Sequence, residues 1–319
     1  TNQFYHNCRK YPLTVEMNTG QLMRGEMMLS YDYPLYRPPS EAYSLILQVT
    51  LGCSHNACTF CTMYKNKKYR QKTWAEICSM IEISAQKYPQ TRKIFLADGD
   101  ALSLPTETLL NTLELLFRSF SSLERVSIYA GPKDALGKSV EELSALRETG
   151  LSLVFLGVES GSDQILFDIK KGVDAKYMIL AGQKIKLSGL QLSATLISGL
   201  GGVEMWEDHA RDSARIISAI KPDYLATLTL VLEEGAPMLS RLHSGSLQML
   251  TPWEVLRETR LFIEQLELSG TIYRSNHASN YFRLAAVLNE QRGELLRSID
   301  KYLEDPLLRS LPADNSRPL

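Results

Sequence analysis

The sequence lacks any long hydrophobic run. Its 319 residues contain no stretch of about eighteen consecutive apolar residues, the length that a transmembrane helix requires. Its first residues also lack the continuous apolar core of a secretory signal. We therefore expect a cytoplasmic protein without a membrane partner.

The sequence also lacks an excess of charge of either sign. The formal net charge is −1, so the composition predicts no broad basic surface, and we do not expect a nucleic-acid partner. The run KNKKYRQK, residues 65–72, is a local basic exception. Runs of this kind are usually solvated surface loops.

Cysteine is rare, and its five copies are an odd number. This count does not indicate a disulfide framework, and it fits a reducing compartment. Three of the five nevertheless lie within nine residues, because Cys53, Cys58 and Cys61 have the spacing C-x4-C-x2-C. Thiolates at such spacing can bind a metal ion or an iron–sulfur cluster.

The cysteine group has no obvious fourth ligand. Structural zinc normally has four, and the candidates for the last position are His55, Cys8 and Cys78. His55 lies between two of the cysteines, where a four-ligand loop would be strained, and Cys78 lies in a helical pattern that favours a buried thiol. A four-iron cluster on three thiolates would leave one iron open for a small chelating ligand. Zinc remains the alternative.

The rest of the chain alternates short apolar runs with longer amphipathic ones. This order predicts an α/β fold, a partial (β/α)6 TIM-like barrel with parallel strands. The prolines of YDYPLYRPPS predict an irregular N-terminal arm over residues 1–43, followed by a core barrel over 44–250. A C-terminal extension over 251–319, with one helix over 285–305, would complete the active-site face. The expected strands are 44–50, 93–98, 125–130, 151–158, 190–198 and 224–232, and the expected helices are 73–88, 105–119, 138–149, 174–188, 205–220 and 252–268.

The loops that follow these strands share an unusual composition. They are the cysteine segment, ADGDALS, AGPKD, GVESGSD, SGLGG and LEEGAPM, each rich in glycine, charge or cysteine. In parallel α/β folds such loops gather at one edge of the sheet, where functional sites form. We therefore expect a single site on one face.

Residues 44–232 resemble the radical S-adenosylmethionine (SAM) superfamily. That family typically has C-x3-C-x2-C with an aromatic residue before the last cysteine; here Phe60 is that residue, and the first gap is one residue longer. The segment GVESGSDQIL is similar to one shared by coproporphyrinogen dehydrogenase-like and tRNA methylthiotransferase-like members. The resemblance implies a [4Fe-4S] cluster on Cys53, Cys58 and Cys61, with SAM on the open iron.

The same resemblance implies contacts to SAM. Gly99 and Asp100 match the motif that receives the SAM amino group. Glu159 matches an acid that binds the ribose hydroxyls, and Lys171 stands where relatives bind the carboxylate. Simpler interpretations are a turn glycine at 99, a helix cap at Asp100 and a solvated Glu159.

TLISGLGG, residues 195–202, resembles the adenosine-binding turn of the family. Gly199 is retained, but Thr195 replaces an aspartate and Gly201 replaces a proline, so this contact is the least matched.

The segment TIYRSNHASNY, residues 271–281, predicts a seventh strand over 271–275 that brings NHASNY to the same face. Its Asn276, His277, Asn280 and Tyr281 are neutral or switchable hydrogen-bonding groups, and they are our candidates for catalytic contacts to the substrate. A plain polar loop is the alternative. Weaker candidates are Tyr129, Lys133, Glu233 and Glu234, while we interpret His209 as a helix surface residue.

The resemblance implies an enzyme that cleaves SAM reductively to a 5′-deoxyadenosyl radical, which abstracts hydrogen from a substrate. We expect a small polar substrate and an electron donor such as flavodoxin or ferredoxin. The alternatives are a tRNA- or peptide-modifying member of the family and a non-catalytic zinc or iron–sulfur binding module. The sequence shows no second cysteine cluster, so we expect no auxiliary iron–sulfur centre.

Overall fold

The computed structural model describes residues 29–315, and its centre is an eight-stranded sheet. The spatial order is β1–β4–β5–β6–β7–β8–β9–β10, so strands that follow one another in the chain are neighbours in the sheet. All pairs from β1 to β9 are parallel, and β10 is antiparallel to β9. The strands are Leu45–Gln48 (β1), Lys93–Ala97 (β4), Arg125–Ala130 (β5), Leu151–Glu159 (β6), Gln191–Ser198 (β7), Tyr224–Thr229 (β8), Thr271–Ser275 (β9) and Leu284–Leu288 (β10). A short ribbon of Thr50–Leu51 (β2) and Arg70–Gln71 (β3) lies outside this sheet.

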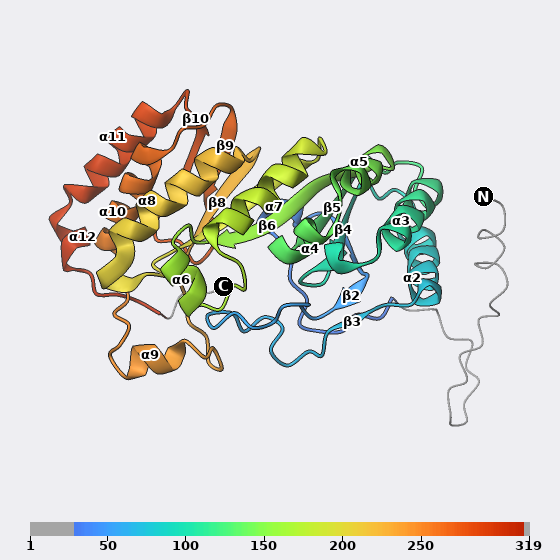
Figure 1. Cartoon of the computed structure of the whole chain (residues 1–319), viewed down its shortest axis with the longest axis horizontal. Helices are drawn as coiled ribbons and strands as arrows, with labels where there is room; N and C mark the ends of the chain where they lie inside the picture. The colour runs from blue at the N-terminus through green and yellow to red at the C-terminus, as the bar shows by residue number, and fades with distance from the viewer. Residues whose placement is uncertain (1–28, 316–319) are drawn as a thin grey trace.

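Helices connect the strands and cover one face of the sheet, while β2, β3 and their loop lie on the other side (Figure 1). This is the arrangement of a partial TIM barrel, as the sequence predicts. The helices are Trp74–Lys87 (α2), Thr106–Ser119 (α3), Pro132–Gly137 (α4), Val140–Glu148 (α5), Asp163–Asp168 (α6), Ala175–Leu187 (α7), Gly202–Ile220 (α8), Leu239–His243 (α9), Pro252–Gln265 (α10), Arg292–Leu303 (α11) and Pro306–Ser310 (α12), with 3₁₀ turns at Pro39–Glu41 and Ala101–Ser103.

Three of the connecting helices begin with a capping box. Thr73, Ser139 and Thr251 each accept a hydrogen bond from the backbone of the glutamate three residues on, whose side chain accepts one from the cap in return. Each such cap typically stabilises its helix by about 1 kcal/mol. The starts of α2, α5 and α10 are therefore encoded locally.

The two faces of the sheet carry different cores, because successive strand residues point to opposite sides. One set of residues, including Leu96 and Val154, packs with the helices in the main core. The alternate set contains Phe95, Phe155 and Tyr129, whose rings pack edge to face. Tyr31 and Leu35 of the arm pack against this second set, so the described part of the arm covers the inner face of the sheet.

The structure confirms the expected strand–helix order, including the seventh strand over 271–275, and corrects some boundaries. The helix expected over 285–305 is wrong in its first part, because residues 284–288 pair with β9 as β10. Their burial alternates, with Leu284, Ala286 and Leu288 buried, so tertiary pairing overrides the helix propensity of alanine. β8 ends at Thr229, before the expected 232, and α8 begins at Gly202. The three-part division of the chain stays a prediction, and residues 1–28 of the arm lie outside the described residues.

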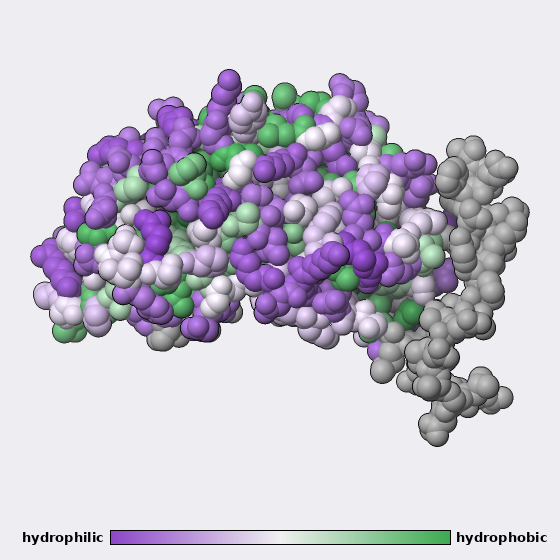
Figure 2. Space-filling model, turned by 60° about the horizontal axis from the view of Figure 1, so that its bottom comes forward, coloured by the Kyte–Doolittle hydropathy of each residue, from purple (hydrophilic) through white to green (hydrophobic). Residues whose placement is uncertain are grey.

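The surface adds little to this picture. On the face shown in Figure 2 hydrophilic side chains predominate, and hydrophobic ones are scattered in small groups. Within residues 29–315 no helix is both long enough and apolar enough to cross a membrane.

Candidate active site

The three cysteines lie on the loop between β2 and β3, beyond the carboxyl end of β1. The backbone of Thr59, within this loop, is held on two sides. Its N–H donates to the carbonyl of Ile169 at 2.9 Å, and its carbonyl accepts from the N–H of Met238 at 2.8 Å. These contacts fasten the cysteine loop to the segments that follow β6 and β8, so three strand ends meet there.

The cysteine thiols are half-buried and act on one another electrostatically. Burial is the main reason that the pKa of each thiol is raised, and the pKa of Cys61 reaches about 11. The Cys53 and Cys58 thiols raise the pKa of Cys61 further, whereas the Lys171 ammonium lowers the pKa of Cys58. Electrostatic coupling of this kind indicates that the three sulfurs lie near one another, as a shared cluster would require. In the described part of the chain, no three His, Cys, Asp or Glu side chains surround a single-ion position.

The proposed fourth zinc ligands have other roles. His55 Nε2 lies 2.7 Å from the carbonyl oxygen of Lys170, to which it donates a hydrogen bond. Cys78 is 5% exposed and belongs to the main core, as its helical pattern predicts. Cys8 lies outside the described residues.

Position 99 requires a glycine, because three segments of the chain approach one another closely there. Its N–H donates to the carbonyl of Gly52 at 3.1 Å. A Cβ at this position would lie 2.5 Å from Cε2 of Tyr64 and 3.0 Å from Cβ of Cys53. The backbone after β4 is therefore pressed against the cysteine loop, and Gly99 is more than a turn glycine.

Asp100 is buried, 1% exposed, and ties three loops together. Its carboxylate accepts hydrogen bonds from Ser54 Oγ at 2.6 Å and from the Gly131 N–H at 2.9 Å. It makes no capping hydrogen bond, so the helix-cap interpretation is wrong. Burial, together with the neighbouring Asp134, raises the pKa of Asp100 well above its usual value.

Glu159 and Lys171 form an ion pair beside the cysteines. Lys171 Nζ lies 2.9 Å from Glu159 Oε1, and Glu159 is only 9% exposed, so the solvated interpretation is wrong. Burial alone would lower the pKa of Lys171, but Glu159 and the thiols of Cys58 and Cys53 raise it above its usual value. Glu159 also has φ of +66°, a left-handed conformation that is strained for a residue with a Cβ. Such outliers cluster at functional sites.

The adenosine-turn candidates lie at the same edge of the sheet. Thr195 on β7 pairs with Gly157 on β6, two residues before Glu159. Gly199 follows β7 with φ of +87°, and its N–H donates to the buried carboxyl of Glu258 at 3.0 Å. Phe60 packs against a separate small core that includes Leu200. The structure thus places the turn after β7 and the cysteine loop in contact.

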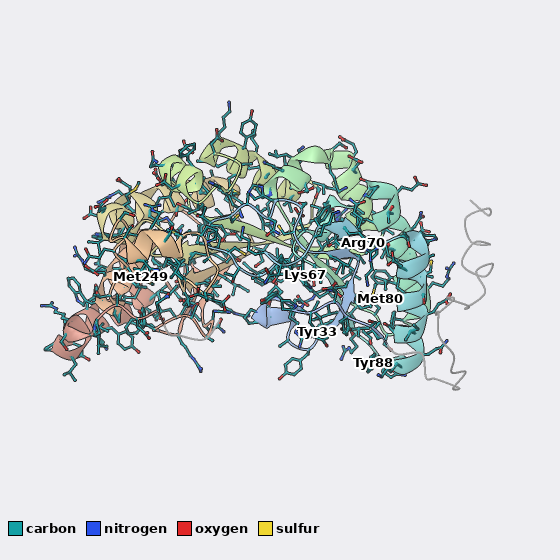
Figure 3. All side chains as sticks on the ribbon, turned by 90° about the horizontal axis from the view of Figure 1, so that it is seen from below. Tyr33, Lys67, Arg70, Met80, Tyr88 and Met249 are labelled. Carbon is teal, nitrogen blue, oxygen red and sulfur yellow. The ribbon has the colours of Figure 1, made fainter. Side chains whose placement is uncertain are left out.

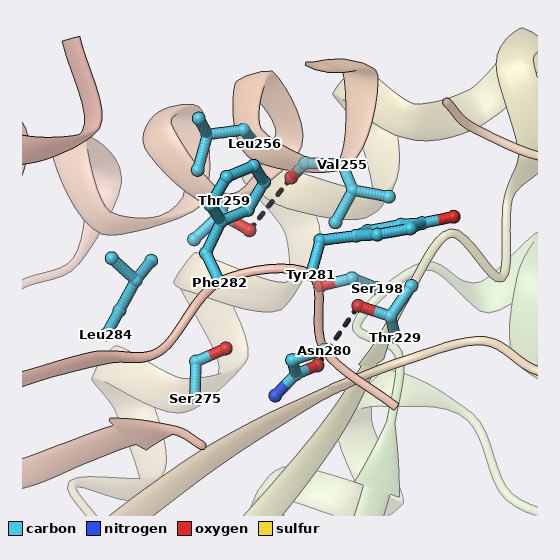
Figure 4. Close-up of a pocket in the computed structure, with 10 residues that line it drawn as sticks. All are labelled: Ser198, Thr229, Val255, Leu256, Thr259, Ser275, Asn280, Tyr281, Phe282 and Leu284. Carbon is cyan, nitrogen blue, oxygen red and sulfur yellow. Dashed lines mark hydrogen bonds between the residues drawn. The ribbon is translucent and has the colours of Figure 1, made fainter. Parts of the chain in front are cut away.

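The four substrate candidates lie on the loop between β9 and β10, and His277, Asn280 and Tyr281 hydrogen-bond within the protein. Asn280 accepts from Thr229 Oγ1 at 3.0 Å and donates to the carbonyl of Thr227 at 2.8 Å, which ties the loop to β8. Asn280 and Tyr281 line a small pocket between the ends of β7 and β8 and helix α10 (Figure 4).

His277 and Asn276 are arranged differently from these two. The Nδ1 atom of His277 accepts from the Ser279 N–H at 3.1 Å, and burial lowers the pKa of this histidine. Asn276 is exposed. A role of any of the four in catalysis stays a prediction.

Sequence reasoning missed the arm as part of the site. Lys67 of the basic run is 9% exposed and lies near the middle of the molecule (Figure 3). It pairs with Asp98 at 3.1 Å and donates to the carbonyls of Asp32 and Pro34 at 2.5 and 2.6 Å. The expectation of a solvated loop is therefore wrong for Lys67, which fastens the arm beside the end of β4.

This fastening places Tyr36 beside the cysteine loop. Its ring lies 5.6 Å, centroid to centroid, from that of Tyr64, which in turn packs against Gly99. Burial, then Glu233 and Cys61, raise the pKa of Tyr36. The only signal in the sequence is the density of tyrosine in YDYPLY, which by itself suggests packing.

The weaker candidates differ in their positions and partners. Glu233, Glu234 and Lys133 are all exposed, and Glu233 accepts a hydrogen bond from Thr62 of the cysteine loop. Tyr129 belongs to the inner aromatic group. The interpretation of His209 as a surface residue is wrong, since it is 3% exposed. The amphipathic pattern of α8 places it on the buried face, where polar partners satisfy it.

The curated relatives with similar sequences are distant. The chain is 22% identical over 186 residues to the heme chaperone HemW of Bacillus subtilis, a match that covers 57% of this chain and 48% of HemW. It is 27% identical over 183 residues to a protein of Methanocaldococcus jannaschii provisionally named a methylthiotransferase, over 53% of this chain and 39% of that protein. The chain thus spans less than half the length of either relative.

Solved structures share the fold, and a family profile shows the family. The radical SAM methyltransferase TsrM from Kitasatospora setae superposes with a TM-score of 0.52 at 16% identity, over 85% of this chain and 55% of TsrM. Coproporphyrinogen III oxidase (HemN) from Escherichia coli gives 0.51 at 16% identity, over 70% and 52%. The profile of the Radical SAM superfamily matches residues 47–213, slightly more than half of the chain, and includes the cysteine loop and the Glu159–Lys171 pair. The chain therefore belongs to the radical SAM superfamily.

Proposed function

We propose that this protein cleaves SAM at a [4Fe-4S] cluster held by Cys53, Cys58 and Cys61 and abstracts hydrogen from a small polar substrate. The observation that carries this proposal is the convergence of the Glu159–Lys171 pair on the cysteine loop. The two segments are separated by about a hundred residues of chain, yet the cysteine loop hydrogen-bonds the residues just before Lys171, with Thr59 donating to Ile169 at 2.9 Å and His55 to Lys170 at 2.7 Å. When bound, the cluster and SAM would supply the electron transfer and radical chemistry.

The residues of the chain would then bind and orient. Lys171 offers a buried ammonium for the SAM carboxylate, a charge-assisted interaction that is strong when desolvated. Glu159 offers carboxylate oxygens for the ribose hydroxyls, and the backbone at Gly99 approaches the cysteine loop closely enough to direct a carbonyl at the amino group. The turn at Thr195 and Gly199 would hold the adenosine.

The position of the arm supports a small substrate, because the arm occupies part of the inner face of the sheet. Tyr31 and Leu35 fill part of that face, and Tyr36 brings a hydroxyl beside the cysteine loop. Tyr36 joins Asn276 and His277 as an uncharged hydrogen-bonding group for a polar substrate. Enzymes of this superfamily need a reductant, for which we propose a flavodoxin or ferredoxin.

The test is anaerobic reconstitution with iron and sulfide, followed by incubation with SAM and dithionite. We expect wild-type protein to form 5′-deoxyadenosine and methionine, and Cys58→Ala to form neither. Lys171→Met should keep its iron but bind SAM roughly tenfold to a hundredfold more weakly, the value of one hydrogen bond to a charged group. Lys176→Met, an exposed lysine on the following helix, is the matched control.

The same experiment separates the alternatives. Zinc without iron in protein purified without oxygen would exclude the proposal and support a zinc module. Transfer of label from SAM into RNA, lost after RNase treatment, would replace the small substrate with a tRNA. Deuterium that appears in 5′-deoxyadenosine from one labelled metabolite would identify the substrate.

A further inference from the structure

A buried polar network lies behind the two turns that follow β6 and β7, and the site described above does not use it. Its members are Glu258 on α10, His209 on α8 and Ser160 after β6, which are 2%, 3% and 0% exposed. Burial of three polar side chains together is costly unless each is hydrogen-bonded. Where their hydrogen bonds go therefore shows what the network holds in place.

Glu258 holds the turn after β7. Its carboxyl oxygens lie 3.0 and 3.3 Å from the backbone nitrogen of Gly199, which donates to them. The hydroxyl of Ser198 is a further hydrogen-bond partner of the same carboxyl. Gly199 lies just beyond the end of β7 with φ of +87°, and Glu258 supplies the acceptor for its N–H.

His209 joins that turn to the one after β6. Its Nε2 donates to the carbonyl of Ile197 at 3.0 Å, so Nδ1 is the acceptor, and it receives the hydroxyl of Ser160 at 2.8 Å. Ser160 directly follows the strained Glu159, and its oxygen also accepts from the N–H of Ser162 at 3.1 Å. Burial lowers the pKa of His209 to about 4, which keeps the ring neutral in this role.

The two halves of the network meet in the core. His209 Nε2 lies 3.9 Å from Glu258 Oε1, and burial raises the pKa of Glu258 to about 8. A neutral histidine and a carboxyl that holds its proton at neutral pH can lie side by side without an uncompensated buried charge. At this separation the two side chains are not hydrogen-bonded to each other, and the turn after β7 joins the two halves, because His209 bonds to Ile197 and Glu258 bonds to Gly199.

We propose that Glu258 and His209 are positioning residues for SAM, which fix the distance between the turn at Glu159 and the turn at Gly199. This inference rests on the proposed function, in which those turns hold the ribose and the adenosine. Each turn receives its orientation from a rigid, buried partner on a helix, so the network presets the nucleoside site before SAM arrives. Pre-organisation of this kind raises affinity by removing the cost of ordering the site on binding.

The test compares two substitutions of Glu258, one that removes the hydrogen-bond acceptor and one that keeps it. Glu258→Leu removes the acceptor at similar size, and Glu258→Gln retains a carbonyl oxygen for the Gly199 N–H. Glu267→Leu, at an exposed position just beyond α10, is the matched control. The readouts are the Kd of radiolabelled SAM for anaerobically reconstituted protein without reductant, the iron content and Tm.

We expect Glu258→Leu to bind SAM roughly tenfold more weakly, the effect of about one hydrogen bond, with unchanged iron content. Competition by S-adenosylhomocysteine should weaken to the same extent, because it carries the same nucleoside, and competition by methionine should not. Glu258→Gln should restore the Kd to within about threefold of wild type, which an effect on fold alone would not explain.

The outcomes separate the two proposals. Wild-type protein that loads iron but binds no SAM would contradict the proposed function itself. Wild-type binding that is matched by Glu258→Leu would overturn only the inference. If Glu258→Leu fails to fold, Ser160→Ala tests the other end by loss of one hydroxyl, and an unchanged SAM Kd in that variant would also refute it.

Discussion

Substitution of Gly99 by alanine tests whether the close approach of β4 to the cysteine loop is what shapes the cluster site. The added Cβ would lie 2.5 Å and 2.8 Å from two carbons of the Tyr64 ring and 3.0 Å from Cβ of Cys53. Carbon atoms prefer separations of about 3.5–4.0 Å, so the ring has to move by roughly 1 Å and Cys53 by roughly half of that.

The consequences for stability and for metal binding differ in size. Overpacking of this kind costs about 1–3 kcal/mol, because Tyr64 is buried, 4% exposed, and also packs against Tyr36 of the arm. Metal–ligand distances tolerate only about 0.2 Å, so a half-ångström displacement of Cys53 should affect the cluster more than the fold. We expect Gly99→Ala to remain folded with a lower Tm and to retain clearly less iron than wild type.

The assay measures iron and sulfide per chain after anaerobic reconstitution, together with the visible absorbance of the cluster and Tm. Gly137→Ala is the control, since a Cβ there meets nothing within 4 Å. Adding Tyr64→Leu to Gly99→Ala should recover part of the lost iron, because the smaller side chain makes room. Full iron loading in Gly99→Ala, with a Tm equal to that of Gly137→Ala, would refute the reasoning.

Three further predictions concern the arm, the loop after β9 and the buried histidine. Lys67→Met should destabilise the protein by about 3 kcal/mol in urea unfolding, because it leaves the carboxyl of Asp98 buried without its cation, whereas the exposed Lys68→Met should not. His277→Ala should keep iron and SAM binding yet abolish substrate-dependent formation of 5′-deoxyadenosine, and unchanged turnover would remove it from the site. His209 has its pKa lowered to about 4, so between pH 6.5 and 4 the unfolded chain binds a proton that the folded chain does not. The free energy of unfolding should therefore fall as pH drops below 6.5, and His209→Gln should flatten that slope; an equal slope in both proteins would contradict the assignment.

The strand–helix order and the meeting of the candidate loops at one edge of the sheet were predictable because they depend on local signals. Apolar runs of strand length, capping boxes such as that of Thr73, and glycines after strands all act within a few residues. Parallel strands then leave no choice about where their carboxyl ends meet. The spacing of Cys53, Cys58 and Cys61 similarly indicates a metal or iron–sulfur site from the sequence alone.

What only the tertiary structure decided depends on contacts between distant segments. Residues 284–288 form a strand because β9 offers a pairing edge, and nothing in the local sequence records that edge. Lys67 is buried because it bonds to Asp98, 31 residues later in the chain, and to Asp32 of the arm, 35 residues earlier. A lysine from a run that the sequence predicts to be solvent-exposed therefore links the arm to the end of β4. Glu258 and His209 bond to Gly199 and Ser160 beside the candidate site, and no short stretch of sequence indicates this, because burial and hydrogen-bond partners are properties of the packed chain.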